Sequence, residues 1–406
     1  MEDWIICLQS RMSKTYTCLA DVPRDILSLI LSKLFFKDHC NFKLVCKSWN
    51  LICSFWPPLL PLIDLPEFHS PCLMIPQMSD CSWTIYHSLY NNSYDFEFPE
   101  LMDSVVLCSK YGWLLVSKDE FMLFFFNPFT RKKIELPPTT KRFLSVCFTS
   151  PPTASDCIIF GILFPGPRNI IYFSYIKVGD EEWKSKSVII ASHIAISSCP
   201  PVFLNGVYYF VEWKFRNIIA FDLIKEEFEF ILIKYDNCSE ESTSVNEEEE
   251  KDEDDNSSEE STSVNEEEEE DGDGDEGEEE YEAPPIIHES YLIEVDGDIW
   301  CVFVTGNERR IIIRKLNLSE HLWMKLESLG NKCLYVSTIG SFAESSDVSG
   351  MGNKIYFNKF HGESGITFSL TSGRYYSFGG GFASKDASGV PEGCYGVWLK
   401  PTLYYM

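Results

Sequence analysis

The feature that most constrains the fold of this 406-residue chain is a strand-and-turn unit that recurs along most of its length. Each copy has a glycine, an apolar run, a polar turn, a second apolar run ending near Asn or Asp, and a third apolar run. Regular copies begin at Tyr111, Leu204, Val295 and Met351, and a less regular copy begins at Asp156. One unit buries too little apolar surface to be stable alone, so neighbouring units are expected to stack.

The length of this region predicts the number of stacked units. Residues 68–406 comprise 339 residues, and subtracting the 44 residues of an acidic tract leaves 295. At about 40 to 50 residues per blade, this length predicts a β-propeller of six or seven blades. A closed ring also removes the exposed edges that so many strands would otherwise have. A pair of β-sandwiches is the competing interpretation.

The acidic tract, residues 239–282, accounts for most of the net charge of −28. It contains 25 acidic residues and one basic residue, and the segment EESTSVNEEEE occurs in it twice, at 240–250 and 259–269. Such a composition cannot bury enough apolar surface to offset chain entropy, so we expect a disordered insertion. Ser244, Ser257 and Ser263 each precede a glutamate by three residues and are candidate phosphorylation sites. An inert solvated loop is the alternative.

The rest of the chain is nearly neutral, with 33 basic and 37 acidic residues. No basic stripe supplies phosphate contacts, so we expect no nucleic-acid partner. No apolar stretch reaches about 18 residues and no signal-peptide pattern opens the chain, so we expect no membrane partner. Fifteen scattered cysteines without a C-x-x-C pair are typical of reduced thiols. We therefore expect an intracellular protein, in the nucleus, the cytoplasm or both.

The segment before the repeats predicts three short helices. Pro23 marks the start of the first helix, Asp38 can cap a second that runs through Val45, and Ser48 can begin a third. Apolar residues between 26 and 35 cover roughly 240° of the first helix at about 100° per residue. Three helices in fewer than 40 residues cannot close a core over so much apolar surface. Another molecule is expected to cover part of it, and the alternative is that the C-terminal domain does so.

Two motifs in this segment give it a family resemblance. VPRDIL at 22–27, followed by Ile30 and Leu34, and VCKSW at 45–49 resemble the pattern of an F-box, the adaptor-binding module of cullin-type ubiquitin ligases. Val22 replaces the first leucine of the pattern, and the turn lacks the proline that many members have. The resemblance implies a Skp-type adaptor as partner, and through it a cullin. It assigns adaptor binding to Pro23, Ile26, Leu27, Ile30, Leu34, Val45, Cys46 and Trp49.

The repeats also resemble a family. The segment GWLLV…FFFNPFTRKKIELPP and the ending GCYGVWLKP are similar to plant F-box proteins with a C-terminal kelch-like domain of unknown function. We therefore predict an α+β multidomain protein, with a small three-helix F-box ahead of a mainly-β ring. Its expected parts are an N-terminal extension (1–18), the F-box (19–56), a proline-rich linker (57–67), and the ring (68–406) interrupted by the acidic insertion (239–282).

No motif of an enzyme or of a cofactor site is present. The seven histidines are far apart, and no metal-ligand spacing, nucleophile elbow or phosphate-binding loop occurs. The prediction is a substrate-recognition subunit of a Skp–cullin–F-box ubiquitin ligase, not an enzyme, that requires no cofactor. The alternative is a propeller scaffold whose F-box works outside a ligase. Loops at one rim of the ring are expected to bind the target protein. The candidates are Arg168, Phe215, Arg216, Asn217, Arg309, Arg310 and His361.

Overall fold

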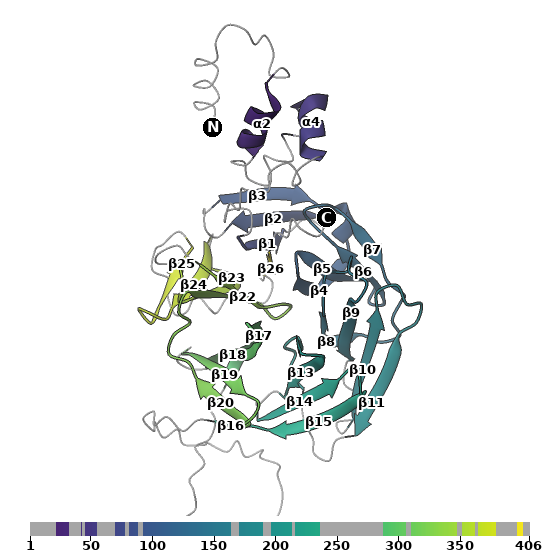
Figure 1. Cartoon of the computed structure of the whole chain (residues 1–406), viewed down its shortest axis with the longest axis vertical. Helices are drawn as coiled ribbons and strands as arrows, with labels where there is room; N and C mark the ends of the chain where they lie inside the picture. The colour runs from purple at the N-terminus through teal and green to yellow at the C-terminus, as the bar shows by residue number, and fades with distance from the viewer. Residues whose placement is uncertain are drawn as a thin grey trace, which may run out of the picture.

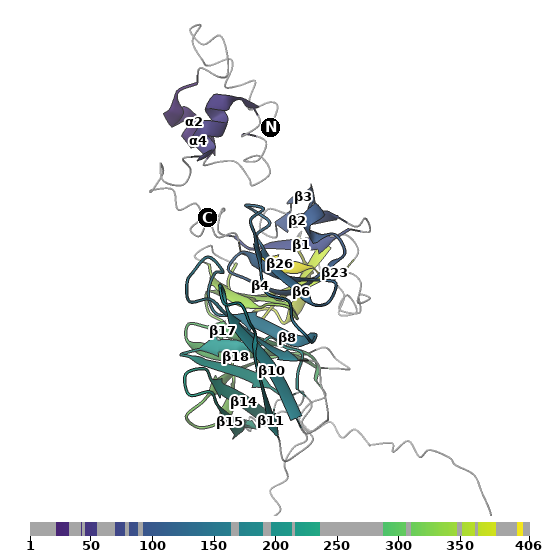
Figure 2. The same ribbon diagram turned by 90° about the vertical axis from the view of Figure 1, so that its right-hand side faces the viewer.

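A computed structural model shows a pair of helices followed by a ring of β-sheets, and in both views the helices lie outside the ring (Figures 1 and 2). The structure describes residues 22–31, 42, 45–54, 70–77, 81–87, 92–163, 170–189, 196–212, 216–235, 287–305, 310–346, 351–361, 364–378 and 396–400. Several sequence predictions lie outside these residues: the extension, the linker, the acidic tract with its three serines, and the sites Leu34, Arg168, Phe215 and Arg309.

The two helices are α2 (Arg24–Leu31) and α4 (Lys47–Ser54). Pro23 precedes α2 as expected, and its carbonyl accepts the first helical hydrogen bond from the Leu27 N–H at 3.0 Å. Asp25 lies in the first turn, where the helix dipole favours an acidic side chain. The helix α4 corresponds to the last predicted helix. It begins at Lys47, one residue before the expected Ser48 cap.

The ring consists of six sheets, which we call blades. From the centre outward, blade 1 contains β26 (Val397–Leu399), β1 (Cys72–Pro76), β2 (Ser82–His87) and β3 (Asn92–Glu97); blade 2 contains β4 (Ser104–Lys110), β5 (Trp113–Lys118), β6 (Met122–Phe126) and β7 (Lys133–Glu135); blade 3 contains β8 (Phe143–Phe148), β9 (Ile158–Leu163), β10 (Ile170–Lys177) and β11 (Lys184–Ile189).

The other three blades complete the ring. Blade 4 contains β12 (Val202–Leu204), β13 (Val207–Val211), β14 (Asn217–Asp222) and β15 (Glu227–Leu232); blade 5 contains β17 (Ile287–Val295), β18 (Asp298–Thr305), β19 (Ile311–Asn317), β20 (Leu322–Lys325) and β16 (Lys234–Tyr235); blade 6 contains β22 (Phe342–Ser345), β21 (Lys332–Val336), β23 (Lys354–His361), β24 (Ser364–Ser369) and β25 (Arg374–Ser377). A short 3-10 helix, η3 (Pro99–Leu101), joins blades 1 and 2.

The repeated glycine of the sequence pattern forms the turn between the first and second strands of a blade. In blades 2 and 4 this two-residue turn is Tyr111-Gly112 and Asn205-Gly206, and all four residues have φ between 51° and 86°. Positive φ at both positions matches the right-handed twist of the flanking strands, and glycine adopts it without steric cost. In blades 2 and 4 the repeat unit therefore starts at the innermost hairpin.

A second recurring turn follows the third strand. The side-chain oxygens of Asn127, Asp222 and Asn317 each accept two backbone N–H groups from residues two and three positions ahead, at 2.9 to 3.2 Å. These side chains satisfy turn donors locally, which explains why the second apolar run of each repeat ends near Asn or Asp.

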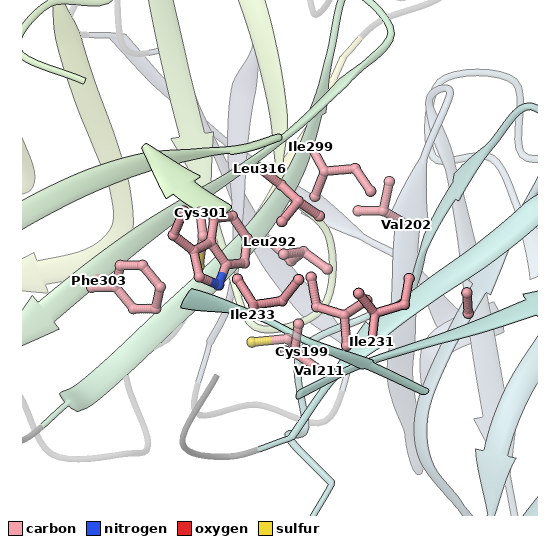
Figure 3. Packing of buried hydrophobic residues seen from close by; sticks show 13 residues of the cluster. Cys199, Val202, Val211, Ile231, Ile233, Leu292, Ile299, Cys301, Phe303 and Leu316 are labelled. Atoms are coloured by element: carbon pink, nitrogen blue, oxygen red, sulfur yellow. The ribbon is translucent and has the colours of Figure 1, made fainter. Parts of the chain in front are cut away.

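Six hydrophobic clusters hold the blades together, one at each junction between neighbours. Figure 3 shows the junction of blades 4 and 5, where Val202, Ile231 and Ile233 lie against Leu292 and Leu316. The last junction, between blades 6 and 1, closes the circle. The six-bladed propeller is therefore confirmed, and the sandwich alternative is wrong.

Closure of the ring depends on β26, which pairs with β1 although more than 300 residues separate them. Trp398 lies opposite Leu73 in this antiparallel pair, and both side chains are completely buried. The hydroxyl of Ser109, on the inner strand of blade 2, donates a hydrogen bond to the Trp398 carbonyl at 2.6 Å. The short C-terminal strand is thus held by both of its neighbours.

A turn from blade 6 reinforces this closure. The buried Asn358 amide donates hydrogen bonds to the Ser337 hydroxyl at 3.3 Å and to the Gly396 carbonyl at 3.0 Å. In the turn that begins at Ser337, the Ile339 carbonyl accepts a hydrogen bond from the Ser109 N–H at 2.8 Å. Blades 1, 2 and 6 therefore share one buried hydrogen-bond network near the centre of the ring.

The nine cysteines whose side chains are described are all free. Most are buried in the junctions between blades, where thiols pack as small hydrophobic groups. Burial raises the pKa of Cys72 and Cys108 to about 12 and that of Cys157 to about 11.

In the part of the chain that the structure covers, no helix is long and apolar enough to cross a membrane.

Candidate interaction surfaces

The helices pack around a very small core. Val22, Leu27 and Phe42 are buried, and Ile30 and Trp49 pack partly against them. The rings of Phe42 and Trp49 stack with their centroids 4.1 Å apart. No residue of the described ring belongs to this cluster.

Part of the remaining helical surface is apolar and exposed. Ile26 and Leu29 on α2 are 44% and 55% exposed, and Val45 and Leu51 near and on α4 are 49% and 46% exposed. A unit this small cannot turn all of its apolar side chains inward. Within the described residues the ring does not cover this surface, so the structure does not support the alternative that the C-terminal domain does so.

The structure places the predicted adaptor-binding residues in three environments. Pro23, Ile26 and Val45 are exposed, and Ile30, Cys46 and Trp49 are half-buried. Leu27 is 1% exposed, because it packs with Val22 and Phe42 in the small core of the helices. It therefore supports the helix pair from inside and cannot reach a partner in this conformation.

Sequence reasoning assigned no role to Leu29 and Leu51, which are exposed beside the predicted residues. Leu29 belongs to the wide apolar arc of the first helix, so the arc itself was the available signal. Leu51 follows the VCKSW motif by two positions and carried no separate signal.

Several predicted target-binding residues lie at equivalent hairpins of the ring. Arg216 and Asn217 adjoin the β13–β14 hairpin of blade 4, Arg310 ends the β18–β19 hairpin of blade 5, and His361 ends β23 in blade 6. Arg216 and Arg310 are exposed, and Asn217 is half-buried.

These hairpins open on one face of the ring. The Lys332 ammonium binds the Asp296 carboxylate at 2.5 Å, so β21 begins beside the innermost turn of blade 5. Because β23 runs parallel to β21, His361 lies at the opposite end of the blade, where the β18–β19 hairpin also lies. The structure therefore brings the described target-binding candidates to a common rim.

The outermost strand of blade 4, β15, adjoins this rim. At its beginning, Glu226 accepts a hydrogen bond from the Tyr175 hydroxyl at 2.6 Å and also pairs with Lys186. Lys186 and Tyr175 hold the pKa of Glu226 below its usual value, while burial and Glu226 raise the pKa of Tyr175 to about 12. At its end, the Ile233 N–H donates to the Arg216 carbonyl at 2.8 Å. Both ends of β15 are thus fixed.

Side chains that could hold a metal ion are absent from the described residues, because no three His, Cys, Asp or Glu side chains are suitably grouped there. The candidate sites are surfaces of the described residues: the exposed apolar side chains on and beside α2 and α4, and the rim and edges of the ring.

Comparison with known proteins gives the same division of the chain. The F-box domain profile matches residues 19–57, and the KIB1-4 beta-propeller profile matches residues 84–378. The Arabidopsis thaliana F-box/kelch-repeat proteins At1g57790 and At3g18720 are 24% and 28% identical, over 88% and 75% of this chain and 88% and 70% of their own lengths. The A. thaliana F-box protein At3g56470 is 30% identical over 48% of this chain, and that match spans about half of its length, 51%.

The propeller profile spans well over half of the chain and reaches from blade 1 to blade 6, and the F-box profile covers both described helices. The chain is therefore a plant F-box protein that belongs to the KIB1-4 beta-propeller family.

Proposed function

We propose that this protein is the substrate-recognition subunit of a Skp–cullin–F-box ubiquitin ligase. The observation that carries the proposal is the set of exposed apolar side chains on and beside α2 and α4, which lie within the F-box match. A Skp-type adaptor would cover these side chains, and a cullin would join through the adaptor.

The mechanism under this proposal is positional. The helices dock the ring onto the ligase, and the ring holds a target protein near the charged ubiquitin-conjugating enzyme, which raises the effective concentration of the reacting groups. No residue of this chain takes part in bond chemistry. The free cysteines support a reducing compartment, so we place the protein in the nucleus or the cytoplasm.

Adaptor contact is assigned to the accessible members of the predicted set, Pro23, Ile26 and Val45, together with Leu29 and Leu51. Ile30, Cys46 and Trp49 contribute at the seam between the two helices, and Leu27 acts from the core. Arg216, Asn217, Arg310 and His361 remain our candidates for target contact at the rim.

The double variant Ile26→Asp with Leu29→Asp tests the adaptor half of the proposal. Both side chains are already exposed, so the folded helices tolerate the carboxylates, but a complex would bury them without partners at a cost of several kcal/mol. We expect purified Skp-type adaptor to bind the variant at least about 100-fold more weakly, as about 2.7 kcal/mol implies. Ile224→Asp, at an 87% exposed position in the ring, is the matched control.

Equal adaptor affinity of the double variant and the control would contradict the proposal. Co-purification of a cullin separates a ligase subunit from a scaffold. If adaptor binding is normal but no cullin accompanies it, the scaffold interpretation replaces the ligase.

A further inference from the structure

We propose that the outer edge of β15 binds an extended peptide segment of a target protein by strand addition, and that this segment carries basic side chains. The inference names the kind of target for the ring and rests on the target-binding half of the proposed function. It does not depend on adaptor binding.

The backbone edge of β15 is open. β15 pairs with β14 through all six of its residues, and it is the last strand in the order of blade 4. Among the described residues, no strand pairs with its other side. In an antiparallel sheet, alternate residues of such an edge point their N–H and C=O groups away from the sheet, where another strand can bind them.

Four of the other five outer strands protect their edges in ways that β15 lacks. The fifth, β3 of blade 1, also has six residues, NSYDFE, and no lysine, but the Arg131 guanidinium donates a hydrogen bond to its Glu97 carbonyl at 2.6 Å. The outer strands β7, β25 and β16 have three, four and two residues. The six-residue β11 carries Lys184 and Lys186, and charged lysines disfavour pairing at an edge. β15 has six residues, EFEFIL, and no lysine.

The two faces of β15 differ in chemistry. Phe228 packs against the blade 3 side, with its ring centroid 4.7 Å from that of Phe173. Phe230 and Leu232 follow on the same face, and they are 42% and 67% exposed. Side chains two residues apart share a face, so an apolar strip runs along the open edge.

The other face of β15 is acidic. Glu227 and Glu229 are exposed there, whereas Ile231 is buried against blade 5. Among described residues, the neighbouring Asp222 and Glu226 pair with Lys225 and Lys186, but no cation lies at ion-pair distance from Glu227 or Glu229. An incoming strand with apolar residues on one face and Lys or Arg on the other would match both faces, because opposite charges on paired strands stabilise a sheet.

A second copy of this chain fits this edge poorly. Pairing of β15 with itself, with the apolar faces on the same side, places four glutamates together on the other side. The chain already has a net charge of −28, which also favours a basic partner over a second copy.

Selection from a displayed library of random 12-residue peptides tests the inference on the full-length protein. We expect enriched peptides to alternate basic and apolar residues over about six positions, the length of the open edge. The best peptide is then synthesised, and its affinity is measured by fluorescence anisotropy. Phe230→Lys with Leu232→Lys should weaken its binding at least 10-fold, and Glu227→Lys with Glu229→Lys should do the same.

Two controls distinguish strand addition from nonspecific binding of the peptide to the protein surface. Ile189→Lys, at a 74% exposed position on the outer strand of blade 3, should leave the affinity unchanged. N-methylation of alternate peptide amides removes the backbone donors and should abolish binding. All variants should bind the adaptor as the wild type does, so failure here and failure of the adaptor half of the proposed function are distinguishable.

Three results would overturn the inference: no peptide is enriched, the enriched peptides bind the Phe230→Lys, Leu232→Lys variant as tightly as the wild type, or N-methylated peptides bind equally well. A concentration-dependent dimer that the same variant abolishes would assign the edge to a second copy instead and would also overturn it.

Discussion

Helices α2 and α4 bury apolar surface far less completely than the ring does. Among the described residues, their cluster contains three buried side chains, whereas the junction between blades 4 and 5 contains thirteen. The exposed aliphatic residues of the helices are 44% to 55% accessible, while Trp398 at the ring closure is inaccessible to solvent. In the described parts of the chain, the helices leave large aliphatic side chains exposed, whereas the ring buries its junctions almost completely. The following experiments test this difference, from the largest expected effect to the smallest.

Trp398→Ala should produce the largest effect, because it removes a completely buried indole from the closing junction. The ring of Trp398 contacts those of Tyr335 and Tyr356, with centroids 4.9 and 6.4 Å apart. We expect a loss of about 3–5 kcal/mol in the free energy of unfolding, measured by urea denaturation with circular dichroism.

The matched variant is Trp49→Ala in the helix pair, where the indole is half-buried. It should leave the unfolding midpoint of the ring unchanged, because the cluster that contains Trp49 includes no described residue of the ring. Equal shifts in the two variants would show that the ring and the helices unfold as one unit, which would break the comparison.

Alkaline pH should destabilise the ring more than the helices. Burial raises the pKa of the Cys72 and Cys108 thiols to about 12 in the folded ring, whereas an unfolded thiol ionises near a pKa of about 8.5. The stability that these neutral thiols contribute is fully present below about pH 8.5 and is lost as pH rises toward 12. Each thiol can contribute a slope of up to about 1.4 kcal/mol per pH unit.

Urea denaturation between pH 8 and pH 10.5 measures this effect. Cys72→Ala should lower the stability at pH 8 but make its fall with pH shallower. A pH dependence identical to that of the wild type would show that Cys72 ionises equally in the folded and unfolded states.

Replacement of the acidic tract should have the smallest effect. The flanking strands β16 and β17 are the outermost and innermost strands of blade 5, four strand spacings or about 19 Å apart. A Gly-Ser linker of about 20 residues spans that distance with its average length of roughly 25 Å. Replacing residues 239–282 by this linker should leave the melting temperature within a few degrees, because loop length costs little entropy.

Differential scanning calorimetry of the wild type and of the linker variant measures this small difference. A large fall in melting temperature would show that the tract stabilises blade 5. The ring would then owe part of its stability to a segment that we expect to lie outside the packed blades.

Local chemistry made much of this protein predictable from its sequence. Turn residues such as Tyr111-Gly112 and Asn127 act within a few residues of the chain. They therefore predicted the hairpins without any knowledge of how the blades are arranged. The start of α2 directly after Pro23 is similarly local. The F-box and propeller assignments rested on motifs of this kind, and both are confirmed. The domain boundaries remain predictions.

Other features depended on which elements meet in space. The sequence left six or seven blades open, because the number is decided when β26 pairs with β1 across the whole chain. The sequence likewise did not show that β16 leaves the blade 4 segment and pairs with β20 in blade 5.

The same distinction separates neighbouring residues on one helix. The sequence by itself determined that α2 has more apolar surface than one face can bury, since helical periodicity is a local property. Only the tertiary structure decided that Leu27 turns inward, because Phe42 and Val22 surround it, and that Ile26 and Leu29 stay exposed. In the same way, composition made EFEFIL a strand, but the position of β15 at the end of blade 4 left its edge open. Burial is set by the neighbours that long-range packing supplies, and a pattern along the chain does not contain them.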